Sequence, residues 1–177
     1  MTSARPDIRL TGRSRRFSMA SPGNVPAGHP PVLVWDPVHR RQVCRLHLRV
    51  RYAETDRMGI AYNAHYLAWF EVGRTELMRC SGMSYLSVEE RGLNLPLIEA
   101  ALRLRAPIRY DDMIEIEARV ERIRSRAIIF GYAIRRGDEA MAEGTTTHAC
   151  VDARRNEAVT LPAWLREHLA RLGGTRS

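Results

Sequence analysis

The chain of 177 residues has no lysine, so arginine supplies all 28 of its fixed positive side chains. The absence of a lysine amine excludes Schiff-base catalysis, and it excludes a Walker A loop, which needs a lysine at the nucleotide phosphates. Residues 1–43 hold seven arginines and two aspartates, a surplus of five, so residues 44–177 carry only +3 of the formal net charge of +8. That small excess is ordinary for a folded domain and suits an anionic small molecule, so the charge gives no reason to expect nucleic acid as a partner.

Cysteine is scarce. Cys44, Cys80 and Cys150 are widely spaced and contain no C-x-x-C pair. An odd number of isolated cysteines argues against a disulfide framework and against a zinc site, and it is typical of reduced thiols in the cytoplasm. We therefore expect a cytoplasmic protein without a metal site.

Long hydrophobic runs are also missing. No segment approaches the roughly 18 apolar residues of a membrane span, and the N-terminus lacks the apolar core of a secretory signal. Residues 1–19 contain five arginines, as an organelle transit peptide does, but Pro6, Asp7 and Gly12 weaken that alternative.

Composition divides the chain into a leader, one domain and a short tail. Residues 1–43 are rich in Pro, Gly, Ser and Arg, and their prolines are spaced too closely for a helix or a sheet ladder. We expect a flexible leader there, although a short apolar patch at residues 32–35 could dock on the domain. Residues 44–172 have the length and the apolar patterns of a single domain, and residues 173–177 form the tail.

The domain is organised around a helical stripe that follows Gly59. Apolar residues and one glycine recur at spacings of three and four, at Tyr62, Tyr66, Phe70, Gly73 and Leu77. This spacing predicts an α-helix whose apolar face packs against a sheet, and Gly73 would allow a close approach between the two.

Asp56 lies three residues before Gly59 and just outside the expected start of that helix. The first turn of a helix presents unpaired backbone N–H groups and a partial positive charge, which favour an anion or an oxygen that becomes one. A carboxylate beside such an oxyanion site is a minimal hydrolytic apparatus. The alternative is an aspartate that only caps the helix or shapes the turn.

Alternating polar and apolar residues predict the strands. The expected strands cover residues 44–52, 102–110, 114–121, 127–134 and 140–151, and shorter helices are expected at residues 85–91 and 161–172. Because most strands follow one another without a helical crossover, the order predicts an α+β domain with an antiparallel sheet of about five strands around one main helix.

The stretch of residues 52–66, Y-A-E-T-D-R-M-G-I-A-Y-N-A-H-Y, is followed by Phe70-Glu71 and Arg74-Thr75-Glu76. Together these residues resemble the signature of the 4-hydroxybenzoyl-CoA thioesterase family, especially its YbgC-like acyl-CoA thioesterase branch. The resemblance covers residues 44–165 and implies the hotdog fold, a curved antiparallel sheet that wraps one long central helix. That architecture agrees with the element order obtained from periodicity.

The resemblance implies that Asp56 is the catalytic carboxylate, acting as a nucleophile or as a general base. It also implies that the backbone N–H of Asn63 polarises the thioester carbonyl, a role that does not depend on the side chain. His65 stands two positions later than the histidine of many YbgC-like proteins, so it inherits no catalytic role.

Further residues are candidates for contact with the substrate. Gly59 belongs to the signature, while Tyr62 and Tyr66 are expected to pack on the sheet, with contact to the acyl group as an additional role. Arg124 and Arg126 could bind the phosphates of CoA, although a solvated strand edge is the simpler alternative for each.

Glu71 is the reserve candidate for the catalytic carboxylate, because a related hotdog group places that acid on the helix. Its three-residue spacing from Arg74 favours an ion pair on the helix surface instead.

The resulting expectation is an acyl-CoA thioesterase, a hydrolase that uses no metal and no redox cofactor. A single small sheet wrapped on one helix offers little concavity, so we expect a homodimer or homotetramer with the sites at the interface. Two alternatives remain: a thioesterase acting on acyl carrier protein, and a non-catalytic hotdog protein that binds acyl-CoA.

Overall fold

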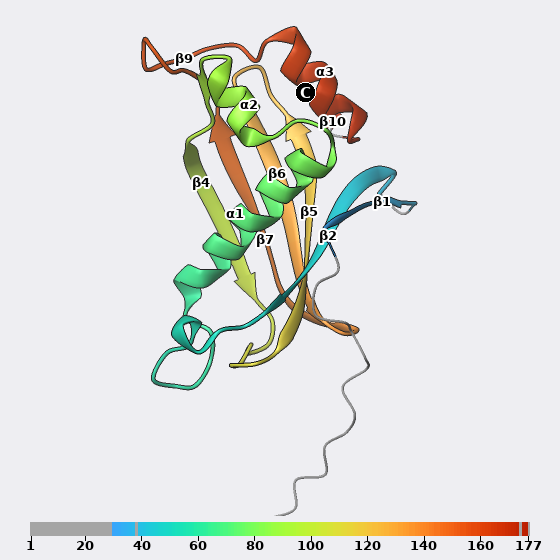
Figure 1. The fold of residues 1–177 in the computed structure, drawn as a ribbon, viewed down its shortest axis with the longest axis vertical. Helices are drawn as coiled ribbons and strands as arrows, with labels where there is room; N and C mark the ends of the chain where they lie inside the picture. Colours follow the sequence, from blue (N-terminus) through green and yellow to red (C-terminus); the bar gives the residue numbers. More distant parts are fainter. Residues whose placement is uncertain (1–29, 38, 174, 177) are drawn as a thin grey trace, which may run out of the picture.

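The structure, a computed structural model, describes residues 30–37, 39–173 and 175–176. Figure 1 shows a long helix lying across one face of a curved sheet. In chain order the elements are β1 (Val32–Asp36), β2 (Arg41–Arg49), a 3-10 helix η1 (Tyr52–Glu54), α1 (Asn63–Cys80), α2 (Tyr85–Glu90), β3 (Leu93–Asn94), β4 (Leu97–Leu104), β5 (Met113–Ile123), β6 (Ala127–Arg136), β7 (Glu139–Ala149), β8 (Val151–Asp152), β9 (Glu157–Ala158), α3 (Ala163–Arg171) and β10 (Thr175–Arg176).

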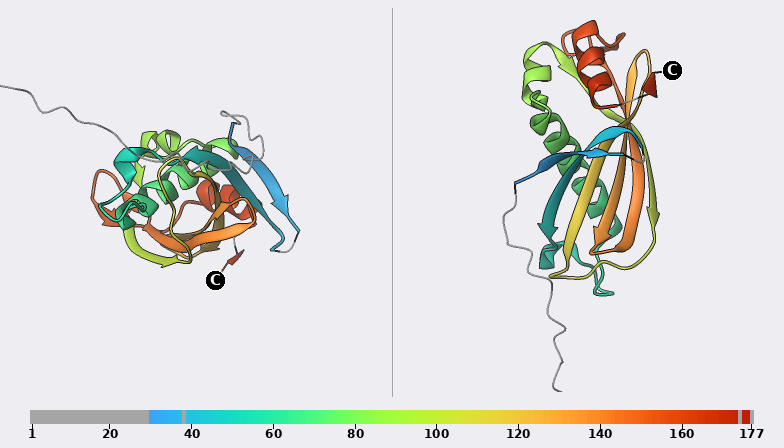
Figure 2. Two further views of the ribbon diagram at one scale, coloured as in Figure 1. Left: turned by 90° about the horizontal axis from the view of Figure 1, so that it is seen from below. Right: turned by 90° about the vertical axis from the view of Figure 1, so that its right-hand side faces the viewer.

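The main sheet is antiparallel along the order β1-β2-β5-β6-β7-β4, and β10 adds a short parallel pairing to β5. Figure 2 shows this sheet curving around α1. The expected α+β hotdog architecture is therefore confirmed, with β2, β4, β5, β6 and β7 as its five principal strands. A second, three-stranded sheet of β3, β8 and β9 lies outside the main one.

The core lies between α1 and the concave face of the sheet. On β5, residues alternate so that Ile114, Ile116, Ala118 and Val120 are fully buried. Gly73 faces them from α1: a β-carbon there would lie 3.1 Å from Cγ2 of Ile116. The close helix–sheet approach expected at Gly73 is thus confirmed.

The expected border at residues 43 and 44 is wrong, because the sheet begins earlier. Val32–Asp36 pair antiparallel with the start of β2, so the apolar patch at residues 32–35 is an edge strand of the sheet. The remainder of the expected leader, residues 1–29, lies outside the described residues.

The expected strand at residues 102–110 is only partly correct. β4 ends at Leu104, and the chain then leaves the ladder through Pro107, whose backbone has no N–H to donate. The apolar alternation continues beyond Leu104 because Ile108, although it lies in a loop, is also buried in the core. No helix of the described residues is long and apolar enough to span a membrane.

Candidate active site

A short closed loop carries Asp56. Thr55 and Ala61 form an isolated antiparallel bridge, and the Asp56 amide donates to the carbonyl of Ile60 at 2.8 Å. Gly59 completes the turn with a φ of +73°, where a side chain would be strained, and its amide donates to the Asp56 carbonyl. The loop therefore fixes the backbone on both sides of the carboxylate.

The Asp56 carboxylate is partly exposed, and one of its oxygens is used locally. Oδ1 accepts a hydrogen bond from the amide of Met58 at 2.8 Å, which makes an Asx-type turn. No hydrogen bond to Oδ2 is formed within the described residues.

The N-terminus of α1 directly follows this loop. Asn63 is the first helical residue, Tyr62 caps the helix without a side-chain hydrogen bond, and no acidic residue stands in the first turn. The amide of Asn63 consequently has no acceptor inside the helix and lies at the positive end of its dipole. The loop that carries Asp56 thus ends directly before a helix start whose first amide, that of Asn63, has no acceptor within α1.

Glu54, which sequence reasoning missed, joins the loop to the helix. Its side chain is 2% exposed, and its carboxylate accepts from the Arg51 amide at 2.7 Å, from the Arg51 guanidinium at 2.8 Å and from Trp69 Nε1 at 3.1 Å. Burial raises the pKa of Glu54, but the bonds from Arg51 and Trp69 outweigh it, and the net shift is below the ordinary value. The only sequence signal was that a buried indole N–H needs an acceptor, which does not identify Glu54.

The two tyrosines of the expected stripe differ. Tyr66 is 2% exposed and packs against Trp69 with ring centroids 5.0 Å apart, as expected for the buried face. Tyr62 is 52% exposed, so its expected packing on the sheet is wrong. Its backbone is extended, with φ −67° and ψ 136°, and a residue outside the helix does not follow the helical periodicity.

Glu71 pairs with Arg74 on α1, as the spacing predicted. Arg74 is not on the helix surface, however: it is 2% exposed and lies 4.6 Å over the ring of Tyr85. Its Nη1 is buried without a hydrogen-bond partner, while Glu71 remains half exposed. The guanidinium of Arg74 is therefore buried, and both carboxylate oxygens of Glu71 accept hydrogen bonds from it.

A hydrogen-bonded chain of buried side chains lies on the inner face of β6 and β7. The Tyr132 hydroxyl and Nε2 of His148 both contact Oγ1 of Thr146, at 2.8 and 3.0 Å, and His148 Nδ1 contacts the Leu95 carbonyl at 2.9 Å. A carbonyl only accepts, so Nδ1 carries the proton of the neutral ring, Thr146 donates to Nε2, and Tyr132 donates to Thr146. Burial lowers the pKa of His148, which favours this neutral form.

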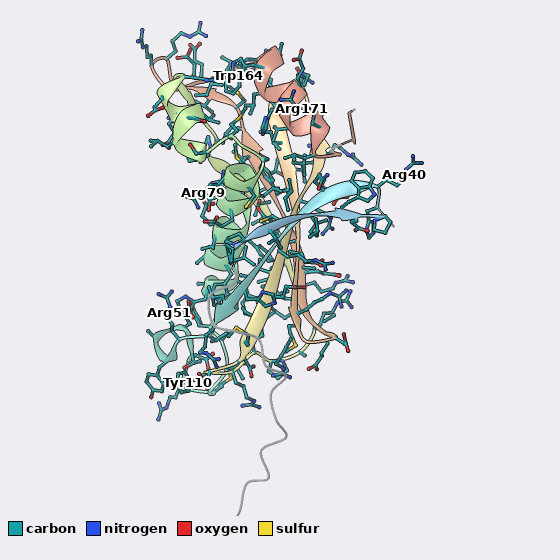
Figure 3. All side chains as sticks on the ribbon, turned by 45° about the vertical axis from the view of Figure 1, so that its right-hand side comes forward. Arg40, Arg51, Arg79, Tyr110, Trp164 and Arg171 are labelled. Carbon is teal, nitrogen blue, oxygen red and sulfur yellow. The ribbon has the colours of Figure 1, made fainter. Side chains whose placement is uncertain are left out.

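The structure does not bring Arg124 and Arg126 to the Asp56 loop within one chain. Both are exposed in the turn between β5 and β6. The Asp56 loop instead contacts the segment that leads into β5, where the Ala61 amide donates to the Ile108 carbonyl. The eleven residues of β5 separate its two ends by about 33 Å. In Figure 3, Arg51 and Tyr110 mark the end of the sheet with the loop, and Trp164 and Arg171 mark the opposite end.

Two hollows on the single chain lie away from Asp56. One, of about 430 Å³, is lined by Ala101, Leu102, Arg103, Arg119, Tyr132, Glu143, Gly144 and Thr145, and the other, of about 280 Å³, lies beside α3. Neither includes Asp56 or Asn63. Among the described residues, no group of three or more His, Cys, Asp or Glu side chains could hold a metal ion.

Comparison with known proteins matches residues 50–169 to the thioesterase-like superfamily. YneP of Bacillus subtilis, named provisionally as an acyl-CoA thioesterase, is 35% identical over 62% of this chain and 80% of its own length. The acyl-CoA thioesterase YbgC of Haemophilus influenzae is 29% identical over 65% of this chain and 85% of its own length. A solved structure of a hypothetical protein of Thermus thermophilus superposes with a TM-score of 0.69 at 34% identity, over 72% of this chain and 98% of its own.

Proposed function

The chain belongs to the thioesterase-like superfamily, and from this premise we propose that it hydrolyses an acyl-CoA thioester to a free carboxylic acid and CoA. The family resemblance carried by residues 52–76 is thereby confirmed. The observation that carries the proposal is the position of Asp56, in a closed loop immediately before the uncapped N-terminus of α1.

In the proposed reaction, the thioester carbonyl oxygen accepts a hydrogen bond from the Asn63 amide. The helix dipole stabilises the negative charge that develops on this oxygen. Asp56 either attacks the carbonyl carbon, giving an acyl-enzyme anhydride that water cleaves, or removes a proton from the water that attacks it. In both routes the C–S bond breaks, CoA leaves as the thiolate and takes up a proton, and one water is consumed.

We propose a homodimer that pairs along β4. Exposed apolar residues on this edge strand support the proposal. Among the described strands, β4 ends the sheet and pairs with β7, and Leu97, Ile98 and Leu104 are 49%, 61% and 50% exposed. Around the Asp56 loop, Tyr52 and Met58 are 78% and 72% exposed. A second copy would cover this surface and supply the second wall of a cleft, while a tetramer would require a further interface.

Antiparallel pairing of two β4 strands would also account for the distant arginines. A two-fold axis at this edge directs the β5–β6 turn of one protomer toward the loop end of the other. In that arrangement, Arg124 and Arg126 of the partner subunit would approach the CoA phosphates bound at Asp56.

A panel of acyl-CoAs, assayed by thiol release, tests the function directly, with Asp56→Asn as the key variant. The asparagine keeps an oxygen for the Met58 amide, so the loop should hold its shape while hydrolysis falls by at least about 100-fold. A fully active Asp56→Asn variant contradicts the mechanism. Activity on acyl carrier protein thioesters alone would favour the alternative carrier, and binding without turnover would favour the non-catalytic alternative.

A further inference from the structure

Glu54 is a buried acid whose contacts reach both sides of Asn63. Before Asn63 in the chain, the Glu54 carbonyl accepts a hydrogen bond from the Tyr62 amide at 2.9 Å. After it, the Glu54 carboxylate accepts from Nε1 of Trp69 at 3.1 Å. Trp69 belongs to α1 and is 1% exposed, so this hydrogen bond attaches Glu54 to the buried side of the helix.

Glu54 is also the last residue of η1 and is separated from Asp56 only by Thr55. The amide and the guanidinium of Arg51 both donate to its carboxylate, which closes η1 on itself. One side chain therefore connects the segment that carries Asp56 to the helix that presents the Asn63 amide. A large movement of α1 relative to the loop would break the hydrogen bond from Trp69 or the one from the Tyr62 amide.

We propose that Glu54 is a positioning residue that sets the distance between the Asp56 carboxylate and the Asn63 amide. This inference rests on the proposed function, because it concerns the geometry of the same site. Glu54 is not a catalytic residue: its carboxylate is buried and all three of its donors come from the protein, so it does not touch a substrate. It acts on the reaction through the loop and the helix.

Glu54→Gln is the informative variant because it preserves size. One carboxylate oxygen accepts from Arg51 Nη2 and Trp69 Nε1, and the other accepts from the Arg51 amide. An amide side chain replaces one of these oxygens with an NH2 donor, so at least one protein donor then faces another donor. We expect kcat to fall about 10- to 100-fold with KM within about threefold, since small misplacements of reacting groups act mainly on the chemical step.

Trp69→Phe removes the other end of the same bond while keeping an aromatic ring, and it should also lower kcat. If both variants act through the Glu54–Trp69 hydrogen bond, the double variant should lose less than the product of the two single losses. Glu76→Gln is the matched control, because it makes the same change in an ion pair with Arg79 on α1 away from the loop. All rates are measured well below the melting temperature of each variant.

Hydrogen–deuterium exchange supplies a readout that does not depend on turnover. In Glu54→Gln, amides of residues 55–66 should exchange faster than in the parent, while amides of residues 71–80 should not. If the parent is active and Glu54→Gln changes neither kcat nor hydrogen–deuterium exchange, the positioning role of Glu54 is overturned. The thioesterase proposal would still stand in that case. A parent that hydrolyses no acyl-CoA would overturn the proposed function, and exchange alone would then decide whether Glu54 holds the loop.

Discussion

The ring of Phe70 stacks on the ring of Tyr132, with centroids 4.3 Å apart and planes 7° from parallel, over a surface that Gly144 leaves open. A β-carbon at Gly144 would lie 2.6 Å from the Phe70 ring and 2.4 Å from the Ala101 carbonyl oxygen. This glycine therefore allows α1 to lie close to the β7–β4 side of the sheet, where the proposed interface begins.

Replacement of this glycine should be costly. Gly144→Ala should lower the free energy of unfolding by about 2–4 kcal/mol, because the backbone carbonyl of Ala101 cannot move aside without disturbing β4. Gly73→Ala should cost less, about 1 kcal/mol, since its closest neighbours are side-chain atoms at 3.1 and 3.2 Å and alanine favours the helix. Chemical denaturation of both variants checks the order, and a more stable Gly144→Ala variant would contradict the close packing.

The backbone role of Asn63 can be tested with proline, which has no amide hydrogen. Proline is tolerated at the first position of a helix, and the extended backbone of Tyr62 suits a residue before proline. Asn63→Pro should thus keep the fold and lower kcat by about 100-fold. Asn63→Ala, which keeps the N–H and loses only the side chain, is the control and should retain most of the activity. Equal activity of the two variants would exclude the amide as the oxyanion donor.

The proposed dimer depends on the exposed apolar residues of β4. Ile98→Glu should weaken association, because each copy would place a carboxylate without a partner in an apolar interface. Light scattering should then show monomers where the parent forms dimers, and activity should fall with the loss of the second wall of the cleft. Leu86→Glu, at an equally exposed leucine on α2, is the control for an apolar-to-acid change elsewhere on the surface. A parent protein that is monomeric at assay concentration would refute the arrangement.

His148 should make stability depend on pH. Burial lowers the pKa of His148 and is the largest cause, the hydrogen bond to the Leu95 carbonyl raises it, and the charges of Arg74 and Glu71 act in opposite directions, so that the net pKa is lowered. In the unfolded chain, His148 takes up a proton near the ordinary histidine pKa of about 6.5. In the folded chain, His148 remains neutral at that pH, so the unfolded state binds more protons. The contribution of His148 is therefore complete above about pH 6.5 and is lost as the pH falls below it.

Urea denaturation from about pH 7.5 to pH 5 measures this effect at constant protein concentration. His148→Gln should reduce the loss of stability on acidification, whereas His65→Asn, at a less buried histidine of α1, should not. His168, whose pKa burial also lowers, accounts for a further part of the slope. An unchanged slope in His148→Gln would contradict the neutral, buried ring.

Periodicity predicted several elements well because it reflects which side of a chain is buried. The alternation at residues 114–121 lies within β5, whose apolar positions are buried. It misplaced Tyr62, because the helix begins one residue later and the pattern does not reveal where a helix starts. It also assigned Arg74 to the surface, since a charged residue on a helix gives no sign that a neighbouring ring and carboxylate will cover it.

The sequence by itself determined that Asp56 stands seven positions before the first residue of α1, with a glycine turn between the two. It also determined the alternation of the strands and the long helix, which depend on local spacing. Only the tertiary structure decided that Glu54 would meet Trp69 and that Arg124 would lie a strand length from Asp56. Such relations depend on how separate elements approach one another in space, and no local pattern of residue types records that approach.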